Sequence, residues 1–288
     1  MKPAPFKYHS PASLPEALEL AATLENAKLL AGGQSLMPMM NFRFVQPDHV
    51  IDLNLINGLS AIERRGDRLF IGAMARQRDI ERSPVVKEAC PIIPEAYHLV
   101  SHTQIRNRGT FGGSLCHLDP ASEQPCFTAA LDGIVIAESK RGRREIPMAE
   151  FSKGYMTTAI AADEVMVGAT LSIWPQGHGY AFIEYSRRHG DYAIVGVAVL
   201  MMTDANRRIT KLSLALCGVA PGPVRLHGAE KALVGQIADA AQFERAAEVA
   251  RGIEAMEDAH VTADYRQHLA GVLTGRALVA AAARCKNG

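Results

Sequence analysis

The sequence lacks the cysteine patterns that bind metal ions or clusters. Its five cysteines are odd in number, lie far apart and never form a Cys-x-x-Cys pair. Zinc and iron–sulfur sites need closely spaced thiolates, so we expect neither in this chain. The pattern instead predicts reduced thiols packed as small apolar side chains, as a cytoplasmic protein allows.

Long apolar runs and an excess of one charge are missing as well. No run approaches the length of a membrane span, and the opening Met-Lys-Pro-Ala-Pro-Phe contains no apolar signal region. The 31 Lys and Arg against 30 Asp and Glu leave a formal net charge of +1. We therefore expect neither nucleic acid nor an anionic membrane as a partner, and we expect a cytoplasmic protein.

Paired glycines are present at two places. One pair, Gly112 and Gly113, stands between the hydroxyls of Thr110 and Ser114 and precedes the carboxylate of Glu123. Glycine can adopt φ > 0 and bring successive backbone N–H groups against an anion, so this stretch is a candidate ligand loop. Two Gly-Gly pairs are about what the glycine content gives by chance. The residues alone therefore leave a ligand loop and a structural turn both open.

The other pair, Gly32 and Gly33, follows a predicted buried strand over residues 28–31 and precedes a helical pattern from Leu36. At a strand–glycine–helix junction, the free N–H groups and the helix dipole favour a phosphate. No lysine follows the glycines, and Gly-x-Gly-x-x-Gly is absent. The sequence therefore excludes a nucleotide P-loop and an ordinary Rossmann fingerprint.

The order of predicted elements indicates an α+β protein with two domains. Ser13 and Glu16 form a capping box at the first helix, and a hairpin over residues 62–72 begins a second lobe. Two helical pieces follow, over residues 80–89 and 91–100. A cluster of helix and strand breakers over residues 174–179 marks the domain boundary. Beyond it, an antiparallel strand pair (193–202 and 209–217) and helices over 242–253 and 261–285 predict a sheet with helices on one side.

We do not expect a metal site or a catalytic nucleophile at the other groups of potentially reactive residues. His98 and His102 are one helical turn apart but have no third ligand at a helpful spacing, so a metal site is not expected. Cys116 and His117 are sequence neighbours on an extended segment and would point to opposite faces. Tyr192 could cover a flat cofactor ring, but the sequence alone favours a core tyrosine.

Three segments together resemble the FAD-binding medium subunit of molybdenum hydroxylases, a family that includes carbon monoxide, quinoline, nicotine and xanthine dehydrogenases. They read LAGGQSL at residues 30–36, IRNRGTFGGS at 105–114 and RHGDYA at 188–193. The resemblance covers nearly the full chain. It implies a two-lobed FAD-binding domain of the vanillyl-alcohol-oxidase type over residues 1–176, with lobes of about 1–57 and 58–176. A smaller C-terminal domain, with an antiparallel sheet and helices, would occupy residues 177–288.

The resemblance also implies which residues bind FAD. The first glycine loop would wrap the pyrophosphate and approach the isoalloxazine, and the second would cradle the phosphates from the opposite lobe. Glu123 would hold the ribose hydroxyls, and Tyr192 would lie against the flavin. Some relatives place a lysine near the isoalloxazine where this chain has Ile183 or Glu184, which leaves the electron acceptor open. The full expected set is Leu29, Leu30, Ala31, Gly32, Gly33, Gln34, Ser35, Leu36, Val100, Thr110, Gly112, Gly113, Ser114, Glu123, Met166 and Tyr192.

In such enzymes, the resemblance implies, molybdopterin in a large subunit oxidises the substrate and [2Fe–2S] clusters in a small subunit pass electrons to FAD. The medium subunit passes them on to an external acceptor. We expect these two partner chains, in a dimer of heterotrimers, and no catalytic acid–base pair or metal site here, because the flavin carries the chemistry. Two alternatives stay open: a self-sufficient flavin oxidoreductase, and a nucleotide-binding regulatory protein without a redox role.

Overall fold

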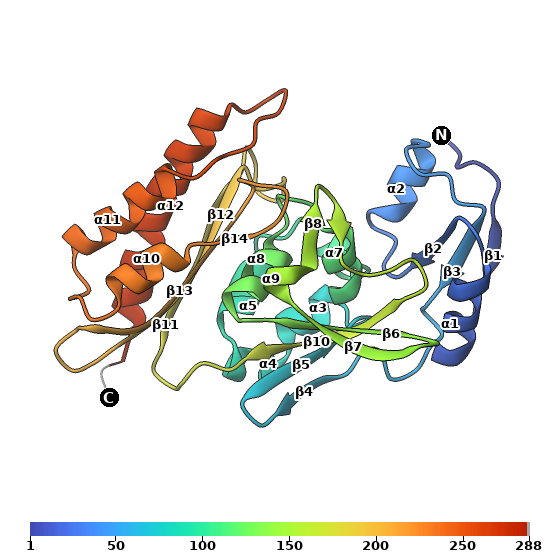
Figure 1. Cartoon of the computed structure of the whole chain (residues 1–288), viewed down its shortest axis with the longest axis horizontal. Helices are drawn as coiled ribbons and strands as arrows, with labels where there is room; N and C mark the ends of the chain where they lie inside the picture. The colour runs from blue at the N-terminus through green and yellow to red at the C-terminus, as the bar shows by residue number, and fades with distance from the viewer. Residues whose placement is uncertain (287–288) are drawn as a thin grey trace.

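Strand pairing divides the chain into three consecutive parts. The computed structural model describes residues 1–286, and Figure 1 shows the three parts side by side along its longest axis. The first lobe is a parallel sheet of order β1-β3-β2 with two helices. Its elements are β1 (Lys7–His9), α1 (Leu14–Thr23), β2 (Ala27–Leu30), α2 (Leu36–Asn41) and β3 (His49–Asp52).

The second lobe is built on an antiparallel sheet of order β4-β5-β10-β6-β7. Seven helices and a small β8-β9 hairpin complete it. Its elements are β4 (Ile62–Arg65), β5 (Arg68–Gly72), α3 (Gln77–Arg82), α4 (Pro84–Ala89), α5 (Ile92–Tyr97), α6 (Thr103–Arg106), α7 (Phe111–His117), α8 (Glu123–Ala130), β6 (Ile134–Ser139), β7 (Gly142–Pro147), α9 (Met148–Phe151), β8 (Ser152–Gly154), β9 (Thr157–Thr158) and β10 (Val165–Ser172).

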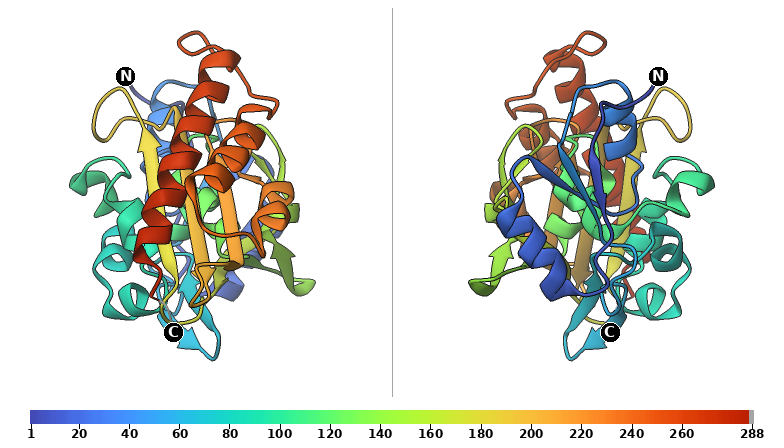
Figure 2. Two further views of the ribbon diagram at one scale, coloured as in Figure 1. Left: turned by 90° about the vertical axis from the view of Figure 1, so that its left-hand side faces the viewer. Right: turned by 90° about the vertical axis from the view of Figure 1, so that its right-hand side faces the viewer.

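The C-terminal part is an antiparallel sheet of order β11-β12-β13-β14. Its own helices cover one face of that sheet, as the left view of Figure 2 shows. The elements are β11 (Gly179–Tyr185), β12 (Val195–Thr203), β13 (Ile209–Cys217), β14 (Val224–Arg225), α10 (His227–Leu233), α11 (Ala240–Arg251) and α12 (Ala263–Arg284). The predicted α+β class, the antiparallel strand pair and the long final helices are confirmed.

Local sequence signals explain several of the helix ends. The side chain of Ser13 accepts the N–H of Glu16, which confirms the predicted cap of α1. The helix predicted over residues 80–89 is wrong, because Ser83 is extended, caps α4 and precedes Pro84. Two short helices, α3 and α4, replace it. The second glycine pair lies in α7, where the sequence allowed only a loop or a turn.

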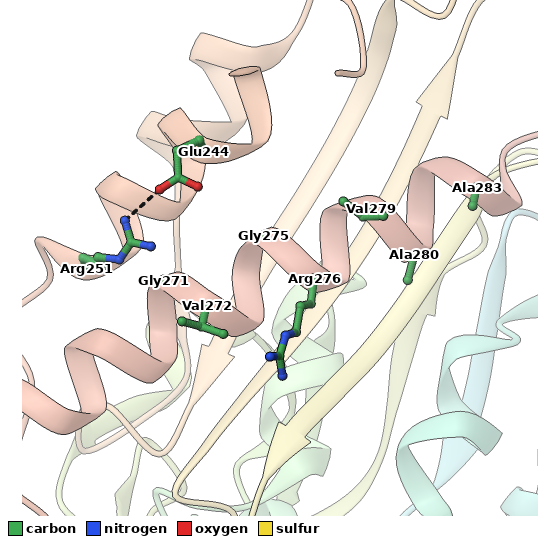
Figure 3. A pocket seen from close by; sticks show the side chains of 9 residues that line it. All are labelled: Glu244, Arg251, Gly271, Val272, Gly275, Arg276, Val279, Ala280 and Ala283. Atoms are coloured by element: carbon green, nitrogen blue, oxygen red, sulfur yellow. Dashed lines mark hydrogen bonds and ion pairs between the residues drawn. The ribbon is translucent and has the colours of Figure 1, made fainter. Parts of the chain in front are cut away.

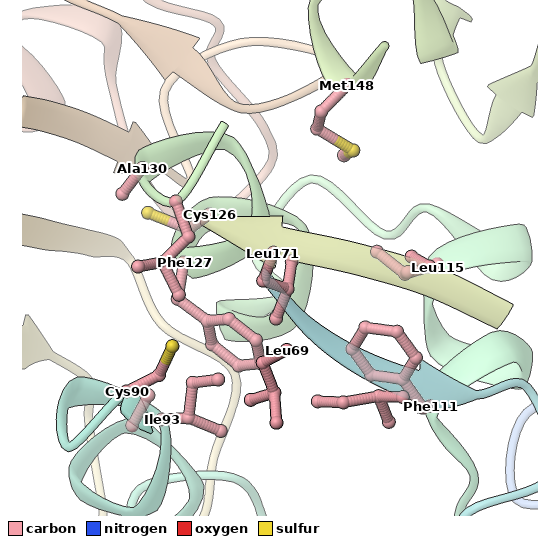
Figure 4. Packing of buried hydrophobic residues seen from close by; sticks show 14 of the residues in the cluster. Leu69, Cys90, Ile93, Phe111, Leu115, Cys126, Phe127, Ala130, Met148 and Leu171 are labelled. Carbon is pink, nitrogen blue, oxygen red and sulfur yellow. The ribbon is translucent and has the colours of Figure 1, made fainter. Parts of the chain in front are cut away.

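One apolar core joins the second lobe to the C-terminal part. It is centred on buried side chains such as Leu69, Phe111 and Phe127 (Figure 4). It also includes Phe182 of β11 and Cys217 of β13, which come from the face of the C-terminal sheet opposite its helices. This sheet is therefore covered on both faces, by its own helices on one side and by the second lobe on the other.

A buried ion pair fixes the segment that leads into α6. Glu81 is almost fully buried and accepts hydrogen bonds from Arg78 (2.8 Å) and Arg106 (3.0 Å). Arg106 also donates to the carbonyl oxygens of Val100 (2.8 Å) and Ser101 (2.9 Å). Burial alone would raise the pKa of Glu81, but the two arginines together lower it. Arg106 therefore compensates the buried negative charge of Glu81 and also fixes the backbone at Val100 and Ser101.

We expect Arg106→Met to destabilise the chain by about 3–5 kcal/mol, because the substitution leaves the Glu81 carboxylate buried with less compensation. Arg78→Met is the matched control and should cost less, since the Arg78 side chain is 25% exposed. Thermal and urea unfolding at neutral pH measure the difference. Because the folded pKa of Glu81 lies below its ordinary value of 4.5, the wild-type advantage should shrink as the pH falls below that value. An equal loss of stability in both variants would contradict the assignment of Arg106 as the main partner of Glu81.

Candidate functional site

The first glycine loop offers free backbone donors. It connects β2 to α2, and Gly33 has a φ of +75°, a conformation that favours glycine. Within residues 1–286, no protein group accepts the N–H of Gly32, Gly33, Gln34 or Ser35. Four successive donors at the start of a helix are the arrangement that binds a phosphate or pyrophosphate.

The second glycine pair differs from the prediction. Neither Gly112 nor Gly113 has a positive φ, and both lie in the first turn of α7. Their N–H groups are already used: Gly112 donates to the carbonyl of Ala73 (2.7 Å), and Gly113 donates to the Thr110 hydroxyl (3.2 Å). The prediction that these two glycines turn their N–H groups toward an anion is therefore wrong. A neighbouring strand end and a helix cap satisfy these donors instead.

The glycines of α7 are needed for close packing. A Cβ on Gly112 would lie 2.6 Å from the Cβ of Ala73, and a Cβ on Gly113 would lie 2.7 Å from the Thr110 hydroxyl. The same added Cβ on Gly113 would be 3.5 Å from Ala31 of the first loop. The start of α7 therefore reaches the first glycine loop, and β2, α2 and α7 meet at the junction of the lobes (Figure 1).

At Gly32, the backbone of the first glycine loop packs directly against the segment that precedes the second glycine pair. A Cβ there would stand 2.3 Å from the carbonyl oxygen of Arg108 and 2.8 Å from the Cα of Gly109. The backbone of the first lobe thus lies directly against the backbone that leads into α7. Only glycine permits this approach.

Polar side chains that were not predicted from the sequence form hydrogen bonds at the junction between the two lobes. Arg76 donates to the carbonyl of Arg108 (2.5 Å) and to the side-chain oxygen of Asn54 (2.6 Å). Asn54 in turn donates to the carbonyl of Ala31 (2.9 Å). A cleft of about 380 Å³ beside the first loop is lined by Asn54, Arg108 and Asp52 among others. The sequence signal for these residues is weak, since Asp52 and Asn54 are only two polar residues at the end of a short apolar stretch.

Helix α7 links other predicted residues to the junction. The hydroxyls of Ser114 and Ser122 lie 3.2 Å apart, which ties α7 to the residue before α8. The sulfur of Cys116 lies 3.7 Å from that of Met166, a buried residue of β10. Cys116 is exposed, and among residues 1–286 its thiol has no hydrogen bond to an imidazole or a carboxylate. This agrees with setting Cys116 aside as a nucleophile.

Glu123 is a buried residue, and no other residue among 1–286 forms a hydrogen bond or ion pair with its carboxyl group. It is the first residue of α8 and is 7% exposed. Burial, and then the charge of Glu184, raise its pKa to about 8. A buried polar group without a protein partner is the feature expected where a ligand completes the hydrogen bonding.

Tyr192 is not a core residue, so the interpretation favoured by the sequence alone is wrong. Its side chain lies in the loop between β11 and β12 and is 67% exposed. Partial burial of the hydroxyl, and then the charges of Asp119 and Glu123, raise its pKa. Tyr192 is thus an exposed aromatic residue whose hydroxyl is near enough to Glu123 to be affected by its charge.

A larger hollow of about 500 Å³ lies elsewhere, between α11 and α12 (Figure 3). Its lining is mainly glycine, alanine and valine, and its Arg251 is paired with Glu244 at 2.9 Å. Figure 1 shows these helices at the opposite end of the molecule from the glycine loops. Within the described chain, no three His, Cys, Asp or Glu side chains gather to hold a metal ion. No helix of residues 1–286 could cross a membrane.

Two family models match the chain in succession. The first, described as the FAD binding domain in molybdopterin dehydrogenase, matches residues 4–171. The second, described as the CO dehydrogenase flavoprotein C-terminal domain, matches residues 180–281.

Full-length relatives give the same result. The chain is 39% identical to the carbon monoxide dehydrogenase medium chain of Hydrogenophaga pseudoflava, covering 99% of this chain and 100% of that one. It is 40% identical to the nicotine 6-hydroxylase medium subunit of Paenarthrobacter nicotinovorans, with the same coverage. A solved structure of the Hydrogenophaga carbon monoxide dehydrogenase superposes with a TM-score of 0.96 at 40% identity, covering 99% and 100% of the two chains. Quinoline 2-oxidoreductase from Pseudomonas putida 86 superposes with a TM-score of 0.94 at 36% identity, covering 98% and 99%. The resemblance seen in the sequence is therefore confirmed, and the chain belongs to the family of FAD-binding medium subunits of molybdenum hydroxylases.

Proposed function

We propose that this chain holds FAD at the junction of its two lobes and passes electrons from the [2Fe–2S] clusters of a small subunit to an external acceptor. The observation that carries the assignment of the site is the row of four unpaired N–H groups from Gly32 to Ser35. A pyrophosphate satisfies such donors, and the helix dipole of α2 adds to the attraction. When bound, FAD supplies the electron-carrying chemistry, and the protein supplies binding, orientation and electrostatics.

The other expected residues take different roles in this proposal. Thr110 and Gly112 shape the start of α7, and Gly113 and Ser114 present its surface to the cofactor. Glu123 accepts hydrogen bonds from ribose hydroxyls, and Tyr192 covers the flavin ring. The remaining contacts come from the first loop and from side chains lining the cofactor: Leu29, Leu30, Ala31, Leu36, Val100 and Met166.

We place the domain boundary near residues 176/177 and the lobe boundary near 57/58. Support comes from strand pairing, because the strands of each sheet come from one of these three segments. The partners are a molybdopterin-binding large subunit and a [2Fe–2S] small subunit, in a dimer of heterotrimers. The five cysteines are unpaired, which suits a reducing compartment, so we place the complex in the cytoplasm.

A visible spectrum of the purified protein separates this proposal from a regulatory nucleotide-binding role, because bound flavin absorbs at about 450 nm. Reduction of that flavin by an organic substrate without partner chains would instead favour a self-sufficient oxidoreductase. Purification from the native host, with the co-purifying chains identified and assayed, also reveals the substrate and the acceptor.

We expect Gly32→Ala to lower FAD affinity by at least tenfold. The added methyl cannot fit against the carbonyl of Arg108, so the two lobes must separate at the site where the pyrophosphate binds. Gly228→Ala is the matched control, because a Cβ at Gly228 meets no atom within 4 Å. Titration of the apo chain with FAD measures the affinity. A folded Gly32→Ala variant that binds FAD like the wild type would show that pyrophosphate does not sit at this contact.

We expect Tyr192→Ala to keep most of the FAD but to change the flavin reduction potential and its reoxidation rate. Loss of the aromatic cover exposes the ring to water and oxygen, whereas the affinity comes mainly from the first loop. Since the side chain is 67% exposed, its truncation leaves no core cavity, and the melting temperature should stay within about 2 °C of wild type. An unchanged potential and unchanged reoxidation would remove Tyr192 from the cofactor site.

A further inference from the structure

The loop that carries Tyr192 (residues 186–194, the Tyr192 loop) is fixed at its base and at its tip. At the base, Ile194 donates its N–H to the carbonyl of the last residue of β11 (2.7 Å). At the tip, Gly190 has a φ of +86°, and a Cβ there would lie 2.4 Å from Nδ1 of His102 in the second lobe. The loop therefore reaches from the C-terminal sheet to the second lobe, and Tyr192 lies between these two contacts.

Arg266 of α12 fixes the base of this loop from inside the protein. Its side chain is almost fully buried and donates to the carbonyl oxygens of Ile194 (2.6 Å) and Gly218 (2.5 Å). It also forms an ion pair with Asp258. Burial of a charge is costly unless the charge is paired and hydrogen-bonded, so the guanidinium favours the arrangement in which these three acceptors stay together.

Gly218 connects the same point to the segment that precedes Glu123. Gly218 directly follows β13 and donates its N–H to the carbonyl of Pro120 (2.7 Å), which lies in the second lobe. It has a φ of +79°, and a Cβ there would stand 2.3 Å from the carbonyl oxygen of Ile194. Only glycine allows the two backbones to come so close. The buried guanidinium therefore lies where the Tyr192 loop meets a backbone that is hydrogen-bonded to the second lobe.

Tyr192 depends on this backbone for its position. Its side chain is 67% exposed, so few packing contacts of its own hold it. Such a residue keeps one position only if the backbone on either side is fixed, which the contact at Gly190 and the hydrogen bonds at Ile194 achieve. Loss of the Arg266 side chain leaves two carbonyl oxygens without their buried donor and releases one of these two attachments.

We propose that Arg266 is a positioning residue for the flavin site. By holding the carbonyl of Ile194, it keeps the Tyr192 loop against the second lobe, so that Tyr192 covers the isoalloxazine. The inference rests on the proposed function, in which Tyr192 has this covering role. Arg266 acts through the loop and not by contact with the cofactor. A buried charge on the last helix thus controls how far water and oxygen reach the flavin.

The test is a double-mutant cycle between Arg266 and Tyr192 in the full chain with bound FAD. The flavin is reduced with dithionite, and its reoxidation by oxygen is followed at about 450 nm. We expect Arg266→Met to speed reoxidation by about threefold or more, in the same direction as Tyr192→Ala, because the loop has lost its anchor. In the Tyr192→Ala background, the same substitution should add little, since the aromatic cover is already absent.

Arg284→Met is the matched control. Arg284 lies on the same helix and also joins a carbonyl to a carboxylate, because it donates to the carbonyl of Tyr180 (2.7 Å) and pairs with Glu95 (2.7 Å). Both arginine substitutions should lower the melting temperature, but Arg284→Met should reoxidise at the wild-type rate. If Arg266→Met does not fold, Arg266→Lys takes its place in the cycle. Lysine keeps the buried positive charge but lacks the planar fork that reaches several acceptors at once.

The outcomes separate the two proposals. Wild-type reoxidation in the folded Arg266 variant, with faster reoxidation in Tyr192→Ala, would overturn the positioning role. An equal effect of the Arg266 substitution with and without Tyr192 would overturn it too, because Arg266 would then act on the flavin by another route. Reoxidation that is unchanged in Tyr192→Ala would remove the covering role of Tyr192 and this inference with it. A chain that binds no FAD would overturn the proposed function itself.

Discussion

The contact on which the site depends is the approach of two backbones at Gly32. The carbonyl of Arg108 lies where a side chain on residue 32 would begin. This contact brings the free N–H groups of the first loop to the start of α7 and closes the junction between two lobes that have separate sheets. Arg76 and Asn54 reinforce it with hydrogen bonds to the carbonyls of Arg108 and Ala31. The packing of neutral backbones thus fixes the geometry of this junction.

The two glycine pairs look alike in the sequence but serve different purposes. Gly32 and Gly33 leave backbone donors free, whereas Gly112 and Gly113 have theirs satisfied by Ala73 and Thr110. The first role could be predicted, because a short strand, a glycine pair and a helical pattern follow one another directly. The second could not, because the acceptor of the Gly112 N–H comes from a strand end almost forty residues earlier. Sequence spacing does not report such a long-range hydrogen bond.

Other parts of the fold also show that local patterns can be predicted from the sequence, whereas tertiary packing cannot. The antiparallel strand pair, the last two helices and the cap at Ser13 follow from local periodicity and capping chemistry, and all are observed. The residues alone favour a core position for Tyr192, because aromatic residues are usually buried, and only the family resemblance points to a place against the flavin. The loop between β11 and β12 holds the side chain at the surface. Glu184 was visible only as a departure from a family pattern. Glu123 was expected from the resemblance, but its place on a helix packed against the C-terminal sheet depends on the contact between α8 and β13, which sequence patterns do not report.

The core that the second lobe shares with the C-terminal sheet has a consequence for how the chain can be divided. Phe182, Ala198, Leu200, Ala215 and Cys217 all face that shared core. A chain ending near residue 176 would leave Leu69, Phe127 and their neighbours without these partners and would expose a broad apolar surface, which promotes aggregation. The segment that the first family model matches, residues 4–171, therefore leaves out part of the core in which it packs. During synthesis, the second lobe must wait for β11 to β13 to emerge from the ribosome before its core can close.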